Sequence, residues 1–289
     1  MDFEAMLRAA RASAARARAD PGPGDAGAAP GRPLGAAIRR LDVLPGEVAY
    51  AQGFVGTEEA AQLAAAVEAR PFVALHGRLL QNYGGVPHLS GTICEPLPEF
   101  LRGLAIRLRE SGAFGHDPPI APDQALVNKY GPSQGIAAHN DGENFKPRAA
   151  IVSLNSYAVL RFFRPEAATL DSPEGPSAAA KSPSRGHEVG SVLLEPNSLL
   201  VFAGAAYEEL THAIDPVETE SIEGVANWDL LSPELRAAGQ IKREERLSLT
   251  LRNVARVQCV VDLEHDYVAP DIREEMARRT VWWRRAISQ

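Results

Sequence analysis

The feature that most constrains this chain is a series of short β-like runs that begins after Asp123. The run RLSLTLR (246–252) alternates leucines with polar residues, which is the period of a strand with one apolar and one polar face. Similar runs cover residues 124–130, 149–163, 191–204 and 257–263, with turn signals at 155–156 and 195–198. Several short strands separated by turn signals favour an all-β sandwich or barrel.

Two segments before these strands have helical patterns. TEEAAQLAAAVEA begins at Thr57 and carries acids in its first turn, where the helix dipole favours them. PEFLRGLAIRLRESG has Pro98 near its start and Gly112 beyond its end. We therefore expect an α+β, mainly β fold in which N-terminal helices cover one face of a sheet.

The chain divides into one central domain and two flanking segments. Residues 1–45 are rich in Ala, Arg, Gly and Pro, so they bury too little apolar surface to fold and should be a disordered extension. An Arg/Ala-rich start can also be a transit peptide, but the acids Asp2 and Glu4 count against that. The central domain should span 46–262, with mobile insertions near 165–190 and 215–245, and 263–289 should be a helical tail.

Composition excludes several classes of protein. No apolar run is long enough for a transmembrane helix, so we expect no membrane partner. Two cysteines make a disulfide framework improbable and fit a reducing compartment, the cytoplasm or nucleus. The net charge of −7 gives no global attraction for nucleic acid, so a polyanion would need a local basic patch. We expect a monomer.

The stretch AAHNDGENF places His139 and Asp141 two residues apart. In an extended segment, side chains at i and i+2 point to the same side, so both could meet one ion. A mononuclear non-haem iron(II) site needs two imidazoles and one carboxylate on one face, with open positions beside them. A plain surface loop is the alternative, because this spacing alone is not specific. His212 is the best candidate for the second imidazole, since it follows the predicted strand ending at residue 204.

The polar face of run 246–252 allows two interpretations. Its residues are Arg246, Ser248, Thr250 and Arg252. For a single strand, a solvated face is the commoner case. The alternative is a dicarboxylate site, because a guanidinium presents a planar fork of donors to a carboxylate. Asn128 and Tyr130, again at i and i+2, offer further hydrogen-bonding groups just before the His139–Asp141 pair.

Together these motifs resemble the AlkB family of Fe(II)/2-oxoglutarate-dependent dioxygenases. The family order is Asn-x-Tyr, His-x-Asp, a distant His, then Arg-x-(Asn/Ser)-x-Thr-x-Arg. Here it reads Asn128, Tyr130, His139, Asp141, His212, Arg246, Ser248, Thr250 and Arg252. The similarity spans about residues 49–257, and GRLLQNYGG and GAAYEELTHAI are most like the eukaryotic branch called AlkB homolog 6.

The resemblance implies a double-stranded β-helix (jelly roll) with buttressing helices, and a catalytic Fe(II) ion held by His139, Asp141 and His212. It implies that Arg246 pairs with the distal carboxylate of 2-oxoglutarate, while Asn128 and Tyr130 hydrogen-bond this co-substrate. Arg252 would lie near its keto-acid end, and Ser248 replaces a frequent Asn, which leaves its contribution open. With O2 as the other co-substrate, such an enzyme hydroxylates a C–H bond, and hydroxylation of an N-methyl group releases formaldehyde.

The substrate is left open by the sequence. Gln81, Asn82 and Tyr83 precede Gly84-Gly85 and could hold a flipped base, or they could form a plain glycine-rich turn. Four cations flank the motifs in sequence and could attract single-stranded or alkylated nucleic acid: Arg78, Lys129, Lys146 and Arg148. An oxygenase acting on a protein or small molecule, and a non-catalytic metal-binding jelly roll, are the alternatives.

Overall fold

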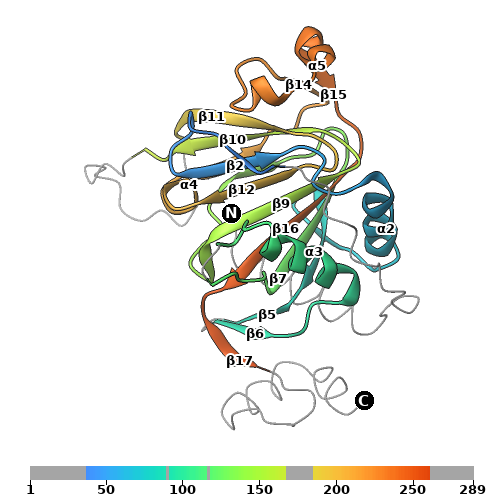
Figure 1. Cartoon of the computed structure of the whole chain (residues 1–289), viewed down its shortest axis with the longest axis vertical. Helices are drawn as coiled ribbons and strands as arrows, with labels where there is room; N and C mark the ends of the chain where they lie inside the picture. Colours follow the sequence, from blue (N-terminus) through green and yellow to red (C-terminus); the bar gives the residue numbers. More distant parts are fainter. Residues whose placement is uncertain (1–36, 89–90, 116–117, 167–184, 261–289) are drawn as a thin grey trace.

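The computed structural model describes residues 37–88, 91–115, 118–166 and 185–260, and most of their strands form two facing sheets (Figure 1). From edge to edge, the larger sheet contains β1 (Arg39–Arg40), β2 (Glu47–Ala51), β12 (Leu199–Ala203), β9 (Phe145–Leu154), β16 (Arg246–Val254), β7 (Gln124–Tyr130), β4 (Arg78–Tyr83) and β3 (Val73–Leu75). The smaller contains β11 (His187–Leu194), β10 (Ala158–Arg164), β13 (Thr211–Ile214) and β8 (Ile136–His139).

The chain passes repeatedly from one sheet to the other between β7 and β16, and neighbouring strands in both sheets are antiparallel. This crossing pattern is the double-stranded β-helix, so the predicted fold class is confirmed. A small third sheet contains β5 (Gly85–His88), β6 (Gly91–Cys94) and β17 (Val257–Val260), the last of which pairs in parallel with β6.

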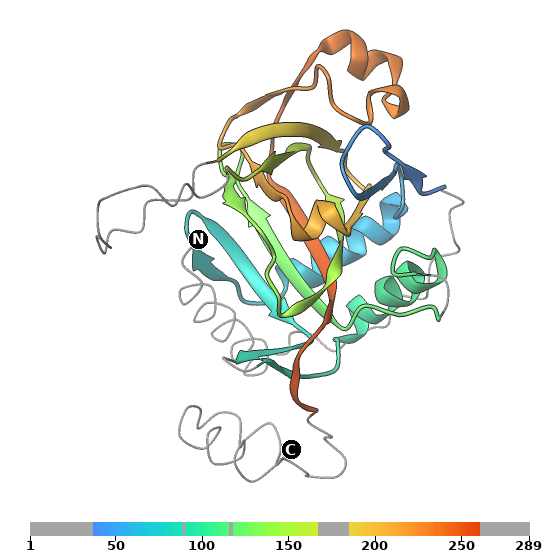
Figure 2. The same cartoon turned by 90° about the vertical axis from the view of Figure 1, so that its left-hand side faces the viewer.

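Helices α2 (Thr57–Glu68) and α3 (Glu99–Glu110) cover one face of the large sheet (Figures 1 and 2). Their apolar stripes, including Leu63 and Leu104, pack against the odd-numbered leucines of β16, such as Leu249. Burial of such stripes is the main force that holds an amphipathic helix to a sheet. The predicted helices are therefore confirmed, and one face of β16 is committed to the core.

The even-numbered residues of β16 and β7 face the smaller sheet, as do the odd-numbered residues of β9 that pair with them. At one end of this space, Ile151 and Phe202 meet Leu160 and Phe162 of β10 in a second apolar core. Next to this core, polar residues line a cavity together with apolar side chains that include Ile151 and Leu160. All nine residues of β16 are buried, so its polar face lines a cavity and is not solvated.

The insertion near 215–245 corrects the prediction of a mobile segment. It forms β14 (Thr219–Ser221), the short helix η1 (Trp228–Leu230), α5 (Pro233–Ala238) and β15 (Gln240–Lys242), and it lies at the end of the molecule opposite β17 (Figures 1 and 2). Ile222, Leu231 and Ile241 pack on Val159 and Leu193, on the outer face of the small sheet. Its few apolar side chains are scattered along the sequence and meet only after folding, which is why the acidic composition misled the prediction.

Two other predicted boundaries change. Residues 39–40 form β1, and Leu41 and Leu44 are buried in the core between the sheets, so the N-terminal extension cannot reach to residue 45. Residues 187–190 belong to β11 and not to an insertion, while 167–184 lie outside the described residues, as do 1–36 and the tail 261–289. Among the described helices, none has the length and apolar character that a membrane crossing requires.

Candidate active site

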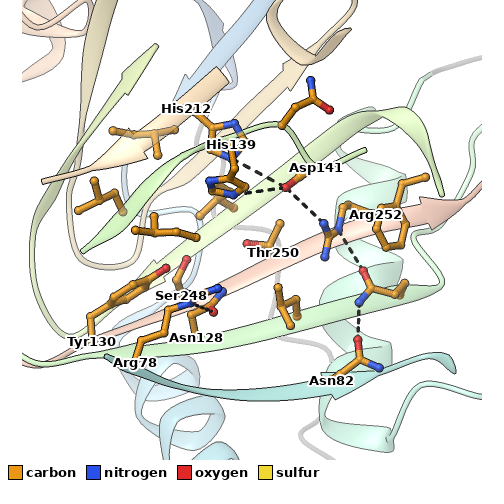
Figure 3. Close-up of a pocket in the computed structure, with 18 of the residues that line it drawn as sticks. Arg78, Asn82, Asn128, Tyr130, His139, Asp141, His212, Ser248, Thr250 and Arg252 are labelled. Carbon is orange, nitrogen blue, oxygen red and sulfur yellow. Dashed lines mark hydrogen bonds and ion pairs between the residues drawn. The ribbon is translucent and has the colours of Figure 1, made fainter. Parts of the chain in front are cut away.

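His139, Asp141 and His212 lie together on one side of the cavity (Figure 3). His139 ends β8, Asp141 follows two residues later, and His212 on β13 pairs directly with His139 across the small sheet. One potential ligand atom from each residue lies within 4.8 Å of the other two. Two imidazoles and a carboxylate on one face form the donor set of a mononuclear iron(II) centre.

Both imidazoles are neutral at neutral pH, which is the form in which a histidine binds a metal. The Nδ1 atom of His139 lies 2.9 Å from the carbonyl oxygen of Ala137, which can only accept, so this nitrogen donates and Nε2 keeps its lone pair. Burial, reinforced by the charge of His212, lowers the pKa of His139 to about 3. Burial likewise lowers the pKa of His212. Neither ring therefore competes for a proton with a metal at neutral pH.

Asp141 is held in its charged form. Burial by itself would raise its pKa, but the charges of Arg252 and the two histidines outweigh burial and lower the pKa. Arg252 Nη1 lies 3.4 Å from Asp141 Oδ1, and each histidine Nε2 lies 3.8 Å from the same oxygen. Asp141 Oδ2 is buried without a hydrogen-bond partner among the described residues. A buried acceptor of this kind fits a cation, since leaving it unpaired is costly.

The cavity wall opposite these three residues is built from β4, β7 and β16. Cross-strand pairs place Tyr130 opposite Arg246, Asn128 opposite Ser248, Leu126 opposite Thr250, and Gln124 opposite Arg252. All eight line the cavity. The sequence-predicted residues Asn128, Tyr130, Arg246, Ser248 and Arg252 are thus brought together with the histidine–aspartate cluster.

At one end of this wall, Arg246 is almost fully buried yet only partly bonded. Its Nη2 atom donates to Ser153 Oγ at 2.8 Å and Ser248 Oγ at 3.3 Å. Its Nε and Nη1 atoms have no partner among the described residues. Burial lowers the pKa of Arg246 to about 10, so the side chain is still charged at neutral pH. The two open donors present the fork that binds a carboxylate.

At the other end, Arg252 is tied on several sides. Its Nε donates to Gln124 Oε1 at 3.1 Å, and its guanidinium carbon lies 4.0 Å from the centre of the Phe145 ring. Gln124 Nε2 donates to Asn82 Oδ1 at 2.9 Å, and Asn82 Nδ2 donates to the carbonyl of Gly85 at 2.6 Å. A chain of contacts therefore runs from Asp141 through Arg252, Gln124 and Asn82 to the β4–β5 corner (Figure 3).

Of the three residues predicted to contact substrate, only Asn82 lines the cavity. Gln81 points to the helices and donates to the carbonyls of Val67 and Arg70. Tyr83 packs edge-on against Phe100, and its hydroxyl donates to Gln81. Neighbouring residues of a strand point to opposite faces, so Gln81 and Tyr83 cannot share the direction of Asn82. A direct substrate role for these two is not supported by their packing.

The four predicted cations also take separate positions, and Lys146 is exposed on β9. Lys129 pairs with Glu68 and Glu245 on the helix side of the sheet. Arg148 pairs with Glu47. Arg78 lies inside the cavity instead of on a lid. A basic patch at the site is therefore not formed as the sequence order suggested.

Sequence reasoning missed Gln124, Phe145 and the cavity position of Arg78. A signal existed for two of them. Extending the i, i+2 pattern from Asn128 back along β7 leads to Gln124, and the same period along β4 relates Arg78 to Asn82.

The chain is similar to several known proteins. Residues 52–252 match the family model described as the 2OG-Fe(II) oxygenase superfamily. The chain is 30% identical to a Danio rerio protein named probable RNA/DNA demethylase ALKBH6, over 74% of this chain and 88% of the relative. It is 27% identical to the Mus musculus tRNA (carboxymethyluridine(34)-5-O)-methyltransferase ALKBH8, over 62% of this chain and 24% of the relative. A solved structure of OsALKBH1 matches 73% of this chain and 99% of its own, with a TM-score of 0.46 and 17% identity.

Proposed function

The chain belongs to the 2OG-Fe(II) oxygenase superfamily, and we propose that His139, Asp141 and His212 bind the Fe(II) ion of this dioxygenase. The buried cluster of two neutral imidazoles and one charged carboxylate is the observation that carries the proposal. When bound, Fe(II) with 2-oxoglutarate and O2 supplies C–H hydroxylation, in which one oxygen atom enters the substrate and the other enters succinate as CO2 leaves. The protein supplies orientation and exclusion of water.

The co-substrate would lie along the wall opposite the metal cluster. Arg246, with two open donors, would pair with the distal carboxylate of 2-oxoglutarate. The Tyr130 hydroxyl would donate to the same group, because burial raises its pKa and keeps it protonated. Asn128 and Ser248, in the next row of the sheet, would hydrogen-bond the body of the molecule. Arg252 would face the keto-acid end and hold Asp141 in place.

The substrate that we propose is an N-methylated base in single-stranded nucleic acid. The support is similarity to a relative named as a probable RNA/DNA demethylase, and a single-stranded target avoids the cost of unstacking a base from a duplex. Hydroxylation of the methyl group yields a hydroxymethyl amine, which breaks down to formaldehyde and the unmethylated nitrogen. The alternative is a protein or small-molecule substrate, favoured by the net charge of −7 and by the pairing of Lys129 and Arg148 with acids.

We propose that the enzyme works in the cytoplasm or nucleus, which is in keeping with only two cysteines in the sequence. A monomer suffices for this proposal, because each ligand group comes from one chain. The complete set of ligands and arginines supports a catalyst over a non-catalytic metal-binding jelly roll.

The direct test is mass spectrometry of methylated single-stranded RNA and DNA, and of a peptide mixture, after incubation with the full chain, Fe(II), 2-oxoglutarate and O2. We expect loss of 14 mass units per methyl group in the nucleic acid, with release of formaldehyde, and no change with His212→Ala. Gain of 16 mass units in peptides alone would move the assignment to a protein hydroxylase.

A further inference from the structure

Arg78 is a second buried arginine at the Arg246 end of the cavity. Leu79 on β4 pairs with Lys129 on β7, so Arg78 is level with Tyr130, which in turn pairs with Arg246 on β16. The three side chains share the cavity face of adjacent strands, and Figure 3 shows Arg78 and Tyr130 on the same side of the cavity. Tyr130 therefore lies between two guanidinium groups.

The described residues do not neutralise the charge of Arg78. The residue is 5% exposed, and its Nε donates to Asn128 Oδ1 at 3.0 Å. Within the described ranges, no carboxylate lies at ion-pair distance from it. Arg107 shows the contrasting case, because both of its terminal nitrogens lie 2.6 Å from the carboxylate of Glu59. A buried cation without a counter-ion is costly, so an anionic ligand is the partner that this arrangement lacks.

The orientation of Asn128 agrees with such a ligand. Its amide oxygen is occupied by Arg78, so its Nδ2 hydrogens are free to point elsewhere in the cavity. The charges of Arg78 and Arg246 both act on Tyr130 and oppose the burial that raises its pKa. Both guanidinium groups are thus near one hydroxyl, as expected for a shared anion site.

We propose that Arg78 joins Arg246 in binding the distal carboxylate of 2-oxoglutarate and makes this end of the cavity selective for a dicarboxylate. The inference rests on the proposed function and adds a residue from β4, outside the Arg-x-Ser-x-Thr-x-Arg motif. The Nε–Asn128 bond holds the guanidinium, and its terminal nitrogens are the donors for the ligand. Two cations around one carboxylate leave little affinity for an uncharged chain end.

The test compares 2-oxoglutarate with 2-oxopentanoate, which has a methyl group in place of the distal carboxylate. Affinities of both are measured by calorimetry on the full chain loaded with Mn(II), for wild type, Arg78→Gln, and the half-buried control Arg236→Gln on α5, which does not line the cavity. We expect Arg78→Gln to weaken 2-oxoglutarate about tenfold or more, and to leave 2-oxopentanoate and Mn(II) binding within about twofold. The thermal midpoint of the ligand-free protein should not fall, because the variant removes an uncompensated buried charge.

Equal weakening of both ligands would overturn the proposal, because it would mean that Arg78 acts only by shaping the site or by orienting Asn128. Unchanged affinity for both, or a marked fall in the ligand-free midpoint, would overturn it too. If Arg78→Gln does not fold, Arg78→Lys is measured instead. The proposal then requires that Arg78→Lys weaken the binding of 2-oxoglutarate and not that of 2-oxopentanoate. Failure of the proposed function looks different: wild type itself would then bind neither keto acid.

Discussion

The two ends of the cavity each contain an arginine from β16, and the two side chains differ in how many contacts they make with the protein. Arg252 contacts Asp141, Gln124 and the ring of Phe145, so its Nε and Nη1 atoms and its flat face have partners. Arg246 is equally buried, yet two of its nitrogens have no partner within the described part of the chain. The motif presents them as equivalents, six residues apart on one face.

This difference separates two roles. An arginine that makes most of its contacts with the protein can hold a neighbour in place but has fewer donors to offer a ligand. An arginine with buried, open donors carries an energetic cost that a ligand can remove. By this criterion we propose that the Arg252 end of the cavity positions Asp141, and that the Arg246 end, with Arg78 beside it, binds the anion.

The largest expected effect is loss of Fe(II) binding at the Arg252 end of the cavity, where Asp141 lies. His212→Ala should abolish Fe(II) binding, because it removes one of three protein ligands, while the fold remains. Anaerobic Fe(II) titration followed by circular dichroism of the same sample measures both. His187→Ala on the exposed start of β11 is the matched control and should bind Fe(II) normally. Wild-type affinity in His212→Ala would assign the ligand role to another residue.

At the Arg246 end of the cavity, Arg246→Lys should weaken 2-oxoglutarate binding by about 1–3 kcal/mol, the scale of hydrogen bonds to charged groups. The charge is retained but the planar fork is lost. Calorimetry with Mn(II)-loaded protein measures the loss, and Mn(II) affinity itself should stay unchanged. If Arg252→Lys instead produces the larger loss of 2-oxoglutarate affinity, the two ends have been assigned the wrong way round.

A fall in pH should lower the stability of the protein through His139, at the proposed metal site, before it affects Arg246. The pKa of His139 is about 3 in the folded protein, because of burial and the charge of His212, and 6.5 when unperturbed. Between these values the unfolded chain binds a proton that the native state excludes, so the free energy of unfolding falls as pH drops. We expect a loss from His139 of about 1.5 kcal/mol at pH 5.5 relative to pH 7.5.

Urea unfolding of the metal-free protein at the two pH values measures this loss, and His139→Gln should show less of it. The same fall in His139→Gln would trace it to another group. Arg246 stays charged across this pH range, since its pKa is about 10. The Arg246 end of the cavity should therefore not contribute to the loss of stability.

The smallest expected effect concerns support of Arg252. Gln124→Leu removes the acceptor for Arg252 Nε, so Arg252 can drift from Asp141, and Fe(II) affinity should fall by less than about tenfold. Gln81→Leu is the matched control, because this buried glutamine bonds the end of α2 on the opposite face. Both variants should lose stability, but only Gln124→Leu should lose metal affinity. Equal metal affinity in the two would remove Gln124 from the positioning chain.

The sequence by itself determined the fold class and the chemical character of the site. Strict period two in β16 separates leucines from polar residues, because successive side chains of a strand point to opposite faces. The same rule places His139 and Asp141 on one side, and the position of His212 after a strand made it the remaining candidate. These inferences need only local geometry and residue type.

Only the tertiary structure decided what each face meets. Gln124 and Arg252 are 128 residues apart in sequence, and Arg78 and Asn128 are 50 apart, so no local pattern reports that they bond. The direction of Gln81, the ion pairs of Lys129 and the packing of the 215–245 insertion depend equally on partners from distant segments. The alternation of residues along a strand shows which face of the sheet a side chain occupies. The residue that this side chain contacts depends on the register of the strands and on how the two sheets stack.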